Sequence, residues 1–124
     1  MLNTLPDNAE LLLAKHEGKV IAGGIFIYLD EWGIYYYGAS DHDYRNLMAP
    51  YLVQWSAIQE AKKRGCKYYD FLGISPENSV NHAWAGVTQF KKKFGGKVAN
   101  YPKAKELVLR PLWYWLYKVY KKIR

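Results

Sequence analysis

Three consecutive lysines between two phenylalanines are the residues of this chain best suited to chemistry on an anionic substrate. They lie in the run Phe90-Lys91-Lys92-Lys93-Phe94-Gly95-Gly96. A lysine fixed beside a cleft can stabilise negative charge that develops on a reacting oxygen. Helical geometry of about 100° per residue places Lys91 at the border of the buried face, whereas Lys92 and Lys93 turn toward solvent. Lys91 is therefore the candidate catalytic lysine, and the other two are either solvated charges or phosphate contacts.

Two charged side chains outside that run are further candidates. Asp70 is a carboxylate in the otherwise apolar stretch 68–74, so it needs a hydrogen-bond or ionic partner. It could orient an attacking amine or anchor the loop that follows, and we favour the anchoring role. Arg45 lies where a helix is expected to begin and could hold a phosphate group.

The composition favours an anionic partner. The 124 residues include 18 Lys and Arg against 11 Asp and Glu, which gives a net charge of +7. Positive residues concentrate at 91–105 and 118–124, and such clusters attract polyanions more strongly than an even spread does. Twelve tyrosines and five tryptophans supply ring surface for a ligand or another domain. A chain of this length forms one domain with a single modest core.

Several classes of site are excluded by the sequence. The motifs of nucleotide hydrolases, dinucleotide enzymes and zinc proteins are absent. His16, His42 and His82 have no ligand spacing with one another or with Cys66, so we expect no metal and no cofactor. A single cysteine cannot form an intrachain disulfide, and we expect a reducing compartment with Cys66 buried and inert.

The sequence also favours a cytoplasmic protein. Residues 1–10 lack the basic start and apolar run that export requires. The longest apolar stretches are too short to span a bilayer. The inner face of the plasma membrane is a second expected location.

Hydrophobic periodicity predicts three antiparallel strands in the first third of the chain. Residues 10–29 should form two strands joined by a turn at 16–19, and residues 33–39 a third strand. Regular alternation pairs the side chains of the third strand as follows: Ile34 with Tyr36 on one face, and Tyr35 with Tyr37 on the other. The pair Gly23-Gly24 indicates close packing or a bulge.

A strand-helix-strand crossover is expected to follow. The helix should carry Pro50 near its first turn and end at Gly65. Its predicted apolar face consists of Leu47, Tyr51, Trp55 and Ile58. Residues 67–73 should then form a buried strand parallel to its neighbour, and residues 75–79 a loop.

The last third should contain two helices around a second hairpin. A short helix is predicted from Ala83 to the glycine pair that caps it, with four residues on its inner face: Trp84, Val87, Phe90 and Phe94. Residues 97–101 and 106–109 should form two strands around a turn at 102–105. After Pro111, one apolar face predicts a final helix.

This element order resembles the later part of the acetyltransferase (GNAT-like) fold. We therefore expect an α+β protein with a partial GNAT-like fold, in which helices flank a mixed, mostly antiparallel sheet. A coenzyme A enzyme of that class would place a glycine-rich turn after the central strand, to bind pyrophosphate through backbone amides. Residues 40–46 occupy that place and contain no glycine, which disfavours a thioester donor.

Four ordered motifs resemble those of the Fem family (FemABX) of peptidoglycan interpeptide-bridge aminoacyltransferases. The motifs are Ile21-Ala22-Gly23-Gly24-Ile25, Tyr35-Tyr36-Tyr37-Gly38-Ala39-Ser40, Tyr69-Asp70-Phe71-Leu72-Gly73-Ile74 and the lysine run at 90–96. The resemblance spans most of residues 10–117. It implies transfer of an amino acid from aminoacyl-tRNA to the side-chain amine of a stem peptide, carried on lipid II or a UDP-linked muropeptide. Both substrates are polyanions, in agreement with the net charge.

The resemblance also implies roles for individual residues. Lys91 matches the lysine of the family's Phe-Lys motif, which is implicated at the aminoacyl end of the tRNA, with Phe90 packed beside it. Tyr37 falls where the family's strand end meets the muropeptide, and its phenol could donate a hydrogen bond to a phosphate or sugar oxygen. A tyrosine packed in the core is the alternative for Tyr37.

Family members carry two GNAT-like domains, so residues 1–110 are expected to be the C-terminal portion of the second and inactive alone. Residues 111–124 are expected to form a separate aromatic and basic helix. This helix could dock on the missing N-terminal domain, lie on an anionic membrane face, or pair with a second copy in a homodimer. We expect self-association when the docking partner is absent. The other functional hypotheses are a nonenzymatic module that binds tRNA or anionic lipid, and an acyltransferase with a thioester donor.

Overall fold

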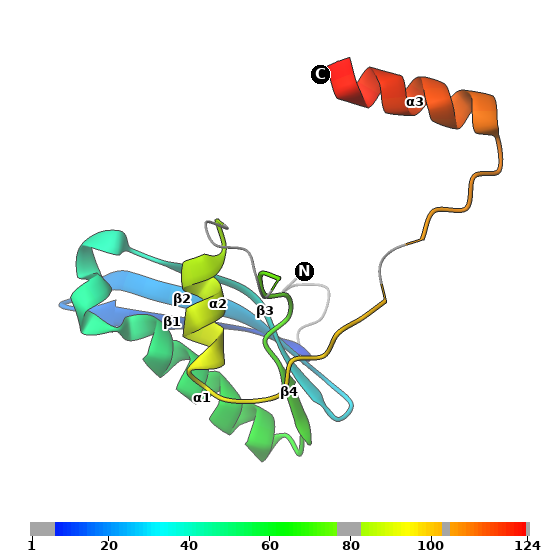
Figure 1. Ribbon diagram of the computed structural model, residues 1–124. Coiled ribbons are helices and arrows are strands. Elements are labelled where there is room, and N and C mark those ends of the chain that lie inside the picture. Colours follow the sequence, from blue (N-terminus) through cyan, green and yellow to red (C-terminus); the bar gives the residue numbers. More distant parts are fainter. Residues whose placement is uncertain (1–6, 77–82, 103–104, 124) are drawn as a thin grey trace.

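The protein is an α+β fold in which one helix lies across a four-stranded sheet (Figure 1). The computed structural model describes residues 7–76, 83–102 and 105–123. The sheet has the strand order β1-β2-β3-β4, and β4 is parallel to β3 while the other pairs are antiparallel. The elements are β1 (Ala9–His16), β2 (Lys19–Leu29), β3 (Trp32–Ser40), the 3-10 helix η1 (His42–Leu47), α1 (Ala49–Lys63), β4 (Tyr68–Asp70), α2 (Ala85–Lys92) and α3 (Pro111–Ile123).

The first three strands confirm the predicted meander. Glu17 and Gly18 form the β1–β2 turn with φ of 49° and 81°, a left-handed pair that suits a two-residue hairpin. A Cβ added at Gly23 would lie 2.7 Å from Leu13 Cδ2. A Cβ at Gly24 would lie 2.8 Å from the ring of Phe26. Close packing therefore explains the glycine pair.

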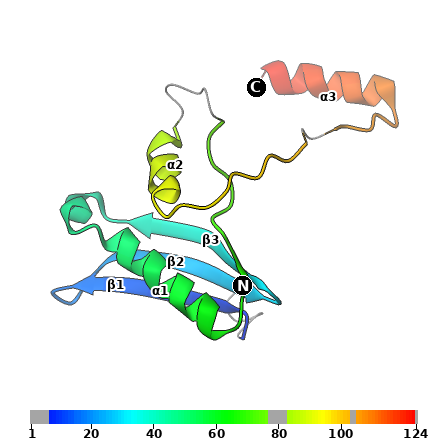
Figure 2. The same ribbon diagram turned by 60° about the horizontal axis from the view of Figure 1, so that its bottom comes forward.

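Small residues, not large ones, bring α1 onto the sheet. Its buried residues are Ala49, Val53, Gln54, Ala57 and Ala61. The predicted apolar face was wrong at two positions, because Trp55 is 56% exposed and Leu47, which precedes the helix, is also exposed. A Cβ on Gly33 would meet Ala61 Cβ at 2.9 Å, so the helix packs too closely for bulky side chains. Figure 2 shows α1 across one face of the β1–β3 sheet.

A β-bulge in β3 changes the predicted alternation. Ile25 pairs with Tyr37 and Phe26 with Tyr35, so Tyr36 has no partner of its own in the β2–β3 register. Consecutive residues of β2 point to opposite faces, and paired residues share a face. Tyr35 therefore packs on the core side with Phe26, whereas Tyr37 is 67% exposed on the open face. The prediction that Tyr35 and Tyr37 share a face was wrong.

The beginning of β3 pairs with the whole of the short strand β4. The register joins Trp32, Gly33 and Ile34 to Tyr68, Tyr69 and Asp70, and then the two chains separate. The predicted strand at 67–73 is thus shorter, and it is only partly buried because Tyr68 is 52% exposed. Cys66 is half-buried, not fully buried as predicted. This separation leaves the edge of β3 beyond Ile34 without a β4 partner.

The carboxyl-terminal third differs most from the prediction. α2 begins at Ala85 and ends before Gly95 and Gly96, whose φ values of 78° and 97° confirm the glycine stop. Its buried residue is Thr88, while Trp84 and Val87 are exposed, which corrects the predicted inner face. The predicted hairpin was also wrong for the described residues, because 97–102 and 105–110 contain no strand. Residues 77–82 and 103–104, which include His82, lie outside the described residues.

Candidate active site

The side chain of Lys91 lies at the point where β3 and β4 separate. Its Nζ donates a hydrogen bond of 2.8 Å to the carbonyl oxygen of Gly73, in the segment that continues β4. The same Nζ lies 5.6 Å from the centroid of the Tyr35 ring on β3. A single ammonium group therefore spans the gap between the separated chains. Lys91 is half-buried.

Partial burial changes the acidity of this lysine. Desolvation lowers the pKa of Lys91 below its ordinary value of 10.5, while the nearby Asp70 carboxylate acts in the opposite direction. The desolvation effect is the larger of the two. The carboxylate of Asp70 thus helps to keep a half-buried ammonium charged.

Asp70 also shapes the backbone beneath Lys91. Its Oδ1 accepts a 2.7 Å hydrogen bond from the backbone N–H of Leu72. Leu72 has a φ of 57°, a left-handed conformation that is uncommon for a leucine, and the bond to Asp70 closes the turn in which it occurs. This contact supports the anchoring role for Asp70, because the turn aims the next carbonyl, that of Gly73, at Lys91.

A pair of buried hydroxyl groups fastens the Gly73 segment to α2. Thr88 Oγ1 accepts a 2.9 Å hydrogen bond from the backbone N–H of Ser75 and lies 2.9 Å from Ser75 Oγ. Both residues are at least nine-tenths buried. We call this contact the Ser75–Thr88 clip. Sequence reasoning missed it, although Thr88 lies one helical turn before Lys91 on the same side of α2.

The floor of the site is a packed polar pair that sequence reasoning also missed. Tyr69 Oη donates a 2.8 Å hydrogen bond to Oε1 of Gln54, which is 1% exposed within α1. Burial raises the pKa of Tyr35, whose ring lies beneath Lys91, and a hydrogen bond with Gln54 opposes that rise. The floor is therefore neutral. The only signal in the sequence was a glutamine among the apolar residues of α1.

Phe90 and Phe94 pack away from Lys91. Phe90 contacts the Tyr51 ring with centroids 4.9 Å apart, and Phe94 stacks on Tyr51 at 5.5 Å and lies 5.3 Å from Phe71. These four rings form a cluster between α1, α2 and the Gly73 segment, and Phe71 joins it to the core through Tyr69, at 5.0 Å between ring centroids. Phe90 and Phe94, two of the four residues predicted on the inner face of this helix, are thus partly buried in this cluster.

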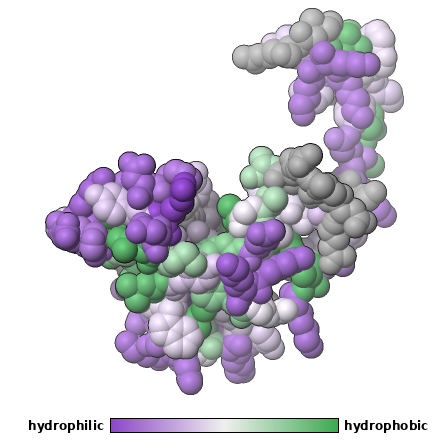
Figure 3. Space-filling model, turned by 60° about the vertical axis from the view of Figure 1, so that its left-hand side comes forward, coloured by the Kyte–Doolittle hydropathy of each residue, from purple (hydrophilic) through white to green (hydrophobic). Residues whose placement is uncertain are grey.

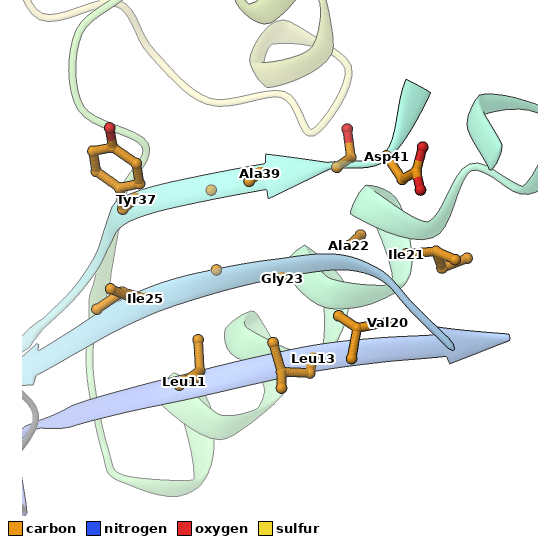
Figure 4. A pocket seen from close by; sticks show the side chains of 13 residues that line it. Leu11, Leu13, Val20, Ile21, Ala22, Gly23, Ile25, Tyr37, Ala39 and Asp41 are labelled. Atoms are coloured by element: carbon orange, nitrogen blue, oxygen red, sulfur yellow. The ribbon is translucent and has the colours of Figure 1, made fainter. Parts of the chain in front are cut away.

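The structure does not bring the other predicted residues to Lys91. Lys92 and Lys93 are exposed, and Lys93 Nζ lies 5.7 Å from the Tyr51 ring. Arg45 Nη1 contacts His42 Nε2 at 2.5 Å within η1. Tyr37 lines a shallow pocket of about 340 Å³ on the open face of the sheet (Figure 4). Most of the other residues that line it are apolar, among them Leu11, Leu13, Val20, Ile25 and Ala39, and Ser40 and Asp41 lie at one end.

The site is suited to polarising a carbonyl group. It offers one partly desolvated ammonium group, a neutral aromatic floor and an edge strand whose backbone beyond Ile34 lacks a β4 partner. Among the described residues, no group of three or more His, Cys, Asp or Glu side chains could hold a metal ion.

The fold is that of the GNAT N-acetyltransferases. A ribosomal-protein-alanine N-acetyltransferase from Brucella melitensis superposes with a TM-score of 0.60 and 16% identity, over 85% of this chain and 74% of that one. An aminoglycoside N-acetyltransferase solved with CoA has a TM-score of 0.55 and 14% identity, over 80% of this chain and 78% of that one. The expected GNAT-like fold is confirmed.

Within that fold class the chain belongs to the FemAB family, whose profile matches residues 3–122. Aminoacyltransferase FemA of Staphylococcus epidermidis is 34% identical over 96 residues, which are 77% of this chain and 23% of that protein. The lipid II:glycine glycyltransferase of Staphylococcus haemolyticus is 31% identical over 72% of this chain and 22% of that protein. The chain thus spans less than a quarter of the length of these relatives.

Proposed function

We propose that this chain is the catalytic-site portion of an aminoacyltransferase that builds peptidoglycan interpeptide bridges. The donor is an aminoacyl-tRNA, and the acceptor is the side-chain amine of a stem peptide on lipid II or a UDP-muropeptide. The observation that carries the proposal is the Lys91 ammonium group at the separation of β3 and β4. The family relationship and the printed activities of the two relatives support it.

The reaction requires stabilisation of one developing charge. The acceptor amine forms a C–N bond to the ester carbonyl carbon, and the carbonyl oxygen becomes an oxyanion. Collapse breaks the C–O bond to the tRNA ribose, whose hydroxyl leaves with the proton that the amine gives up. Lys91 holds a positive charge where the oxyanion forms, and one such donor accelerates comparable acyl transfers by about 10²–10³.

The remaining candidate residues are assigned to binding. Lys92 and Lys93 are exposed beside the site and contact tRNA phosphates. Phe90 anchors α2, the helix that carries Lys91, through the aromatic cluster, and Arg45 holds a phosphate of the acceptor. Tyr37 contacts the muropeptide from the open face of the sheet. Residues 1–110 act as the C-terminal portion of a GNAT-like domain, at the inner face of the membrane, and they require the preceding domain for turnover.

The test is transfer of a labelled amino acid from charged tRNA to a UDP-muropeptide by a full-length protein that contains this sequence. Lys91→Met should lower kcat by about 10²–10³ because the oxyanion loses its cation. Lys97→Met, at an exposed lysine outside α2, is the matched control and should retain activity. Full activity of Lys91→Met would refute the catalytic assignment.

A second candidate function is a nonenzymatic module that binds tRNA. The observation that favours it is coverage, because this chain spans 23% of the FemA relative. One measurement separates the two functions. If the chain is a binding module, the full-length protein retains charged tRNA but releases no labelled product when acceptor is supplied. The same assay with acetyl-CoA in place of charged tRNA tests a thioester donor.

A further inference from the structure

The helix α3 carries a surface that no other described element covers. It spans the 13 residues Pro111–Ile123 and lies apart from the sheet and from α1 and α2 in both ribbon views (Figures 1 and 2). Large side chains along it are exposed, among them Leu112 at 69%, Trp115 at 61% and Tyr120 at 63%. Exposure of so many apolar side chains on one short helix marks an interaction surface.

The side chains of α3 separate into sectors around the helix axis. Successive residues turn by about 100°. This places Leu112, Leu116 and Val119 together on one face, with rings at both borders: Trp115 on one side, and Trp113 and Tyr120 on the other. Lys118 and Lys121 occupy the opposite sector, and Lys122 lies at the border beside Trp115. Figure 3 shows hydrophilic and hydrophobic side chains on different sides of this helix.

The charge of α3 decides between a second copy of this chain and an anionic surface. The segment 111–123 contains three lysines and no acidic residue. A second copy of this chain carries the same helix and a net charge of +7, so pairing two copies brings like charges together. An anionic surface is complementary instead. Around the helix, the side chains change from aliphatic to aromatic to cationic. This sequence matches the change from hydrocarbon to interface to headgroup in a bilayer leaflet.

We infer that α3 binds the surface of an anionic membrane and lies in the interface plane. Thirteen residues measure about 20 Å along a helix, less than the about 30 Å of a bilayer core. No helix among the described residues is long and apolar enough to cross a membrane. The aliphatic face therefore enters the acyl boundary, while the lysines contact lipid phosphates. This inference is independent of the transfer reaction.

Vesicle flotation of the complete 124-residue chain tests the inference. We expect binding to vesicles of equal parts phosphatidylglycerol and phosphatidylcholine, and little binding to phosphatidylcholine alone. Each lysine near an anionic surface strengthens binding about fivefold, so the triple variant Lys118→Gln, Lys121→Gln, Lys122→Gln should lose on the order of a hundredfold. The matched control neutralises three exposed lysines elsewhere: Lys15→Gln, Lys62→Gln and Lys97→Gln. This control has the same net charge as the α3 triple variant and should keep most of the affinity for anionic vesicles.

A fluorescent probe tests the orientation of the helix. In a Cys66→Ser background, Val119→Cys labelled with an environment-sensitive dye should shift to shorter wavelength on anionic vesicles. The same dye at Lys118→Cys should shift much less, because that position faces water. Equal shifts at both positions would overturn the proposed orientation.

Three results would overturn the inference itself. The first is equal loss of vesicle binding in the two triple variants, which would show attraction by net charge alone. The second is equal binding to both vesicle types. The third is a dimer by light scattering that Leu116→Gln dissociates, together with no binding to anionic vesicles, which would assign α3 to a second copy.

Discussion

Lys91 holds its position through contacts with two neighbouring parts of the chain. Its Nζ donates a hydrogen bond to the Gly73 carbonyl oxygen and lies over the Tyr35 ring. The exposed lysines that follow it are not held in this way. Of three identical residues, the one with a fixed environment is therefore the one suited to catalysis.

The acidity of Lys91 provides a direct test of that environment. Because desolvation lowers its pKa, the Nζ signal in NMR should titrate below 10.5 in the folded chain and return to the ordinary value in urea. Asp70→Asn removes a charge that raises this pKa and should lower it further. A folded-state pKa at or above the urea value would contradict the proposed site.

The same shift predicts a small dependence of stability on pH. A lysine whose folded pKa is lowered binds fewer protons in the folded state than in the unfolded state. Its contribution to the free energy of unfolding therefore rises with pH between the lowered pKa and 10.5. The urea midpoint of wild type should therefore rise relative to that of Lys91→Met as the pH increases through that window, and the difference between the two midpoints should be constant outside it. Parallel curves throughout would show that Lys91 is solvated.

The Ser75–Thr88 clip should control both stability and the site. Thr88→Val removes the acceptor of the buried Ser75 N–H and should cost about 1–3 kcal/mol in urea unfolding. It should also move the Lys91 pKa toward its ordinary value, because the Gly73 segment is released. Thr88→Ser keeps the oxygen and should preserve that pKa. If Thr88→Val loses stability but leaves the Lys91 pKa unchanged, the clip is structural only.

At the scale of elements, glycines set how closely strands and rings approach. A Cβ on Gly38 would lie 1.8 Å from Tyr35 Oη, so Gly38→Ala must displace the floor of the site. We expect a loss of about 1–3 kcal/mol in chemical unfolding. Gly86→Ala is the matched control, because nothing lies within 4 Å of its Cβ and alanine favours α2 by up to about 1 kcal/mol. Equal stability of the two variants would exclude the close Tyr35–Gly38 contact.

The elements also show what could be predicted from sequence. Strand alternation and the turn at Glu17 and Gly18 are local, so the β1–β3 meander was predicted. The buried face of α1 was not, because apolar character favours Trp55 whereas the close approach of Ala61 to Gly33 selects small residues. The bulge at Tyr36 depends on pairing with β2, which no single strand encodes. The Ser75–Thr88 clip joins residues 13 apart through a fold that had to form first.

At the scale of the whole molecule, the excess of positive charge predicts salt-sensitive binding of tRNA. The logarithm of the binding constant should fall linearly with the logarithm of salt concentration. Lys92→Gln with Lys93→Gln should reduce the slope by roughly 1.4–1.8, because two phosphate contacts are lost. Lys15→Gln with Lys62→Gln, on β1 and α1, should leave the slope nearly unchanged. Equal slopes for both pairs would place the tRNA elsewhere.

The extra residue at the β3 bulge makes the chain tolerant of a deletion in a way that side-chain chemistry does not suggest. Removing Tyr36 would restore strict alternation and leave the remainder of β3 in place, because Tyr35 would still pair with Phe26 and Tyr37 with Ile25. The side chain of Tyr36 is 48% exposed, so its loss removes little packing. In a library of variants, position 36 should therefore accept many substitutions and also a single-codon deletion, and loss of folding on that deletion would contradict the bulge.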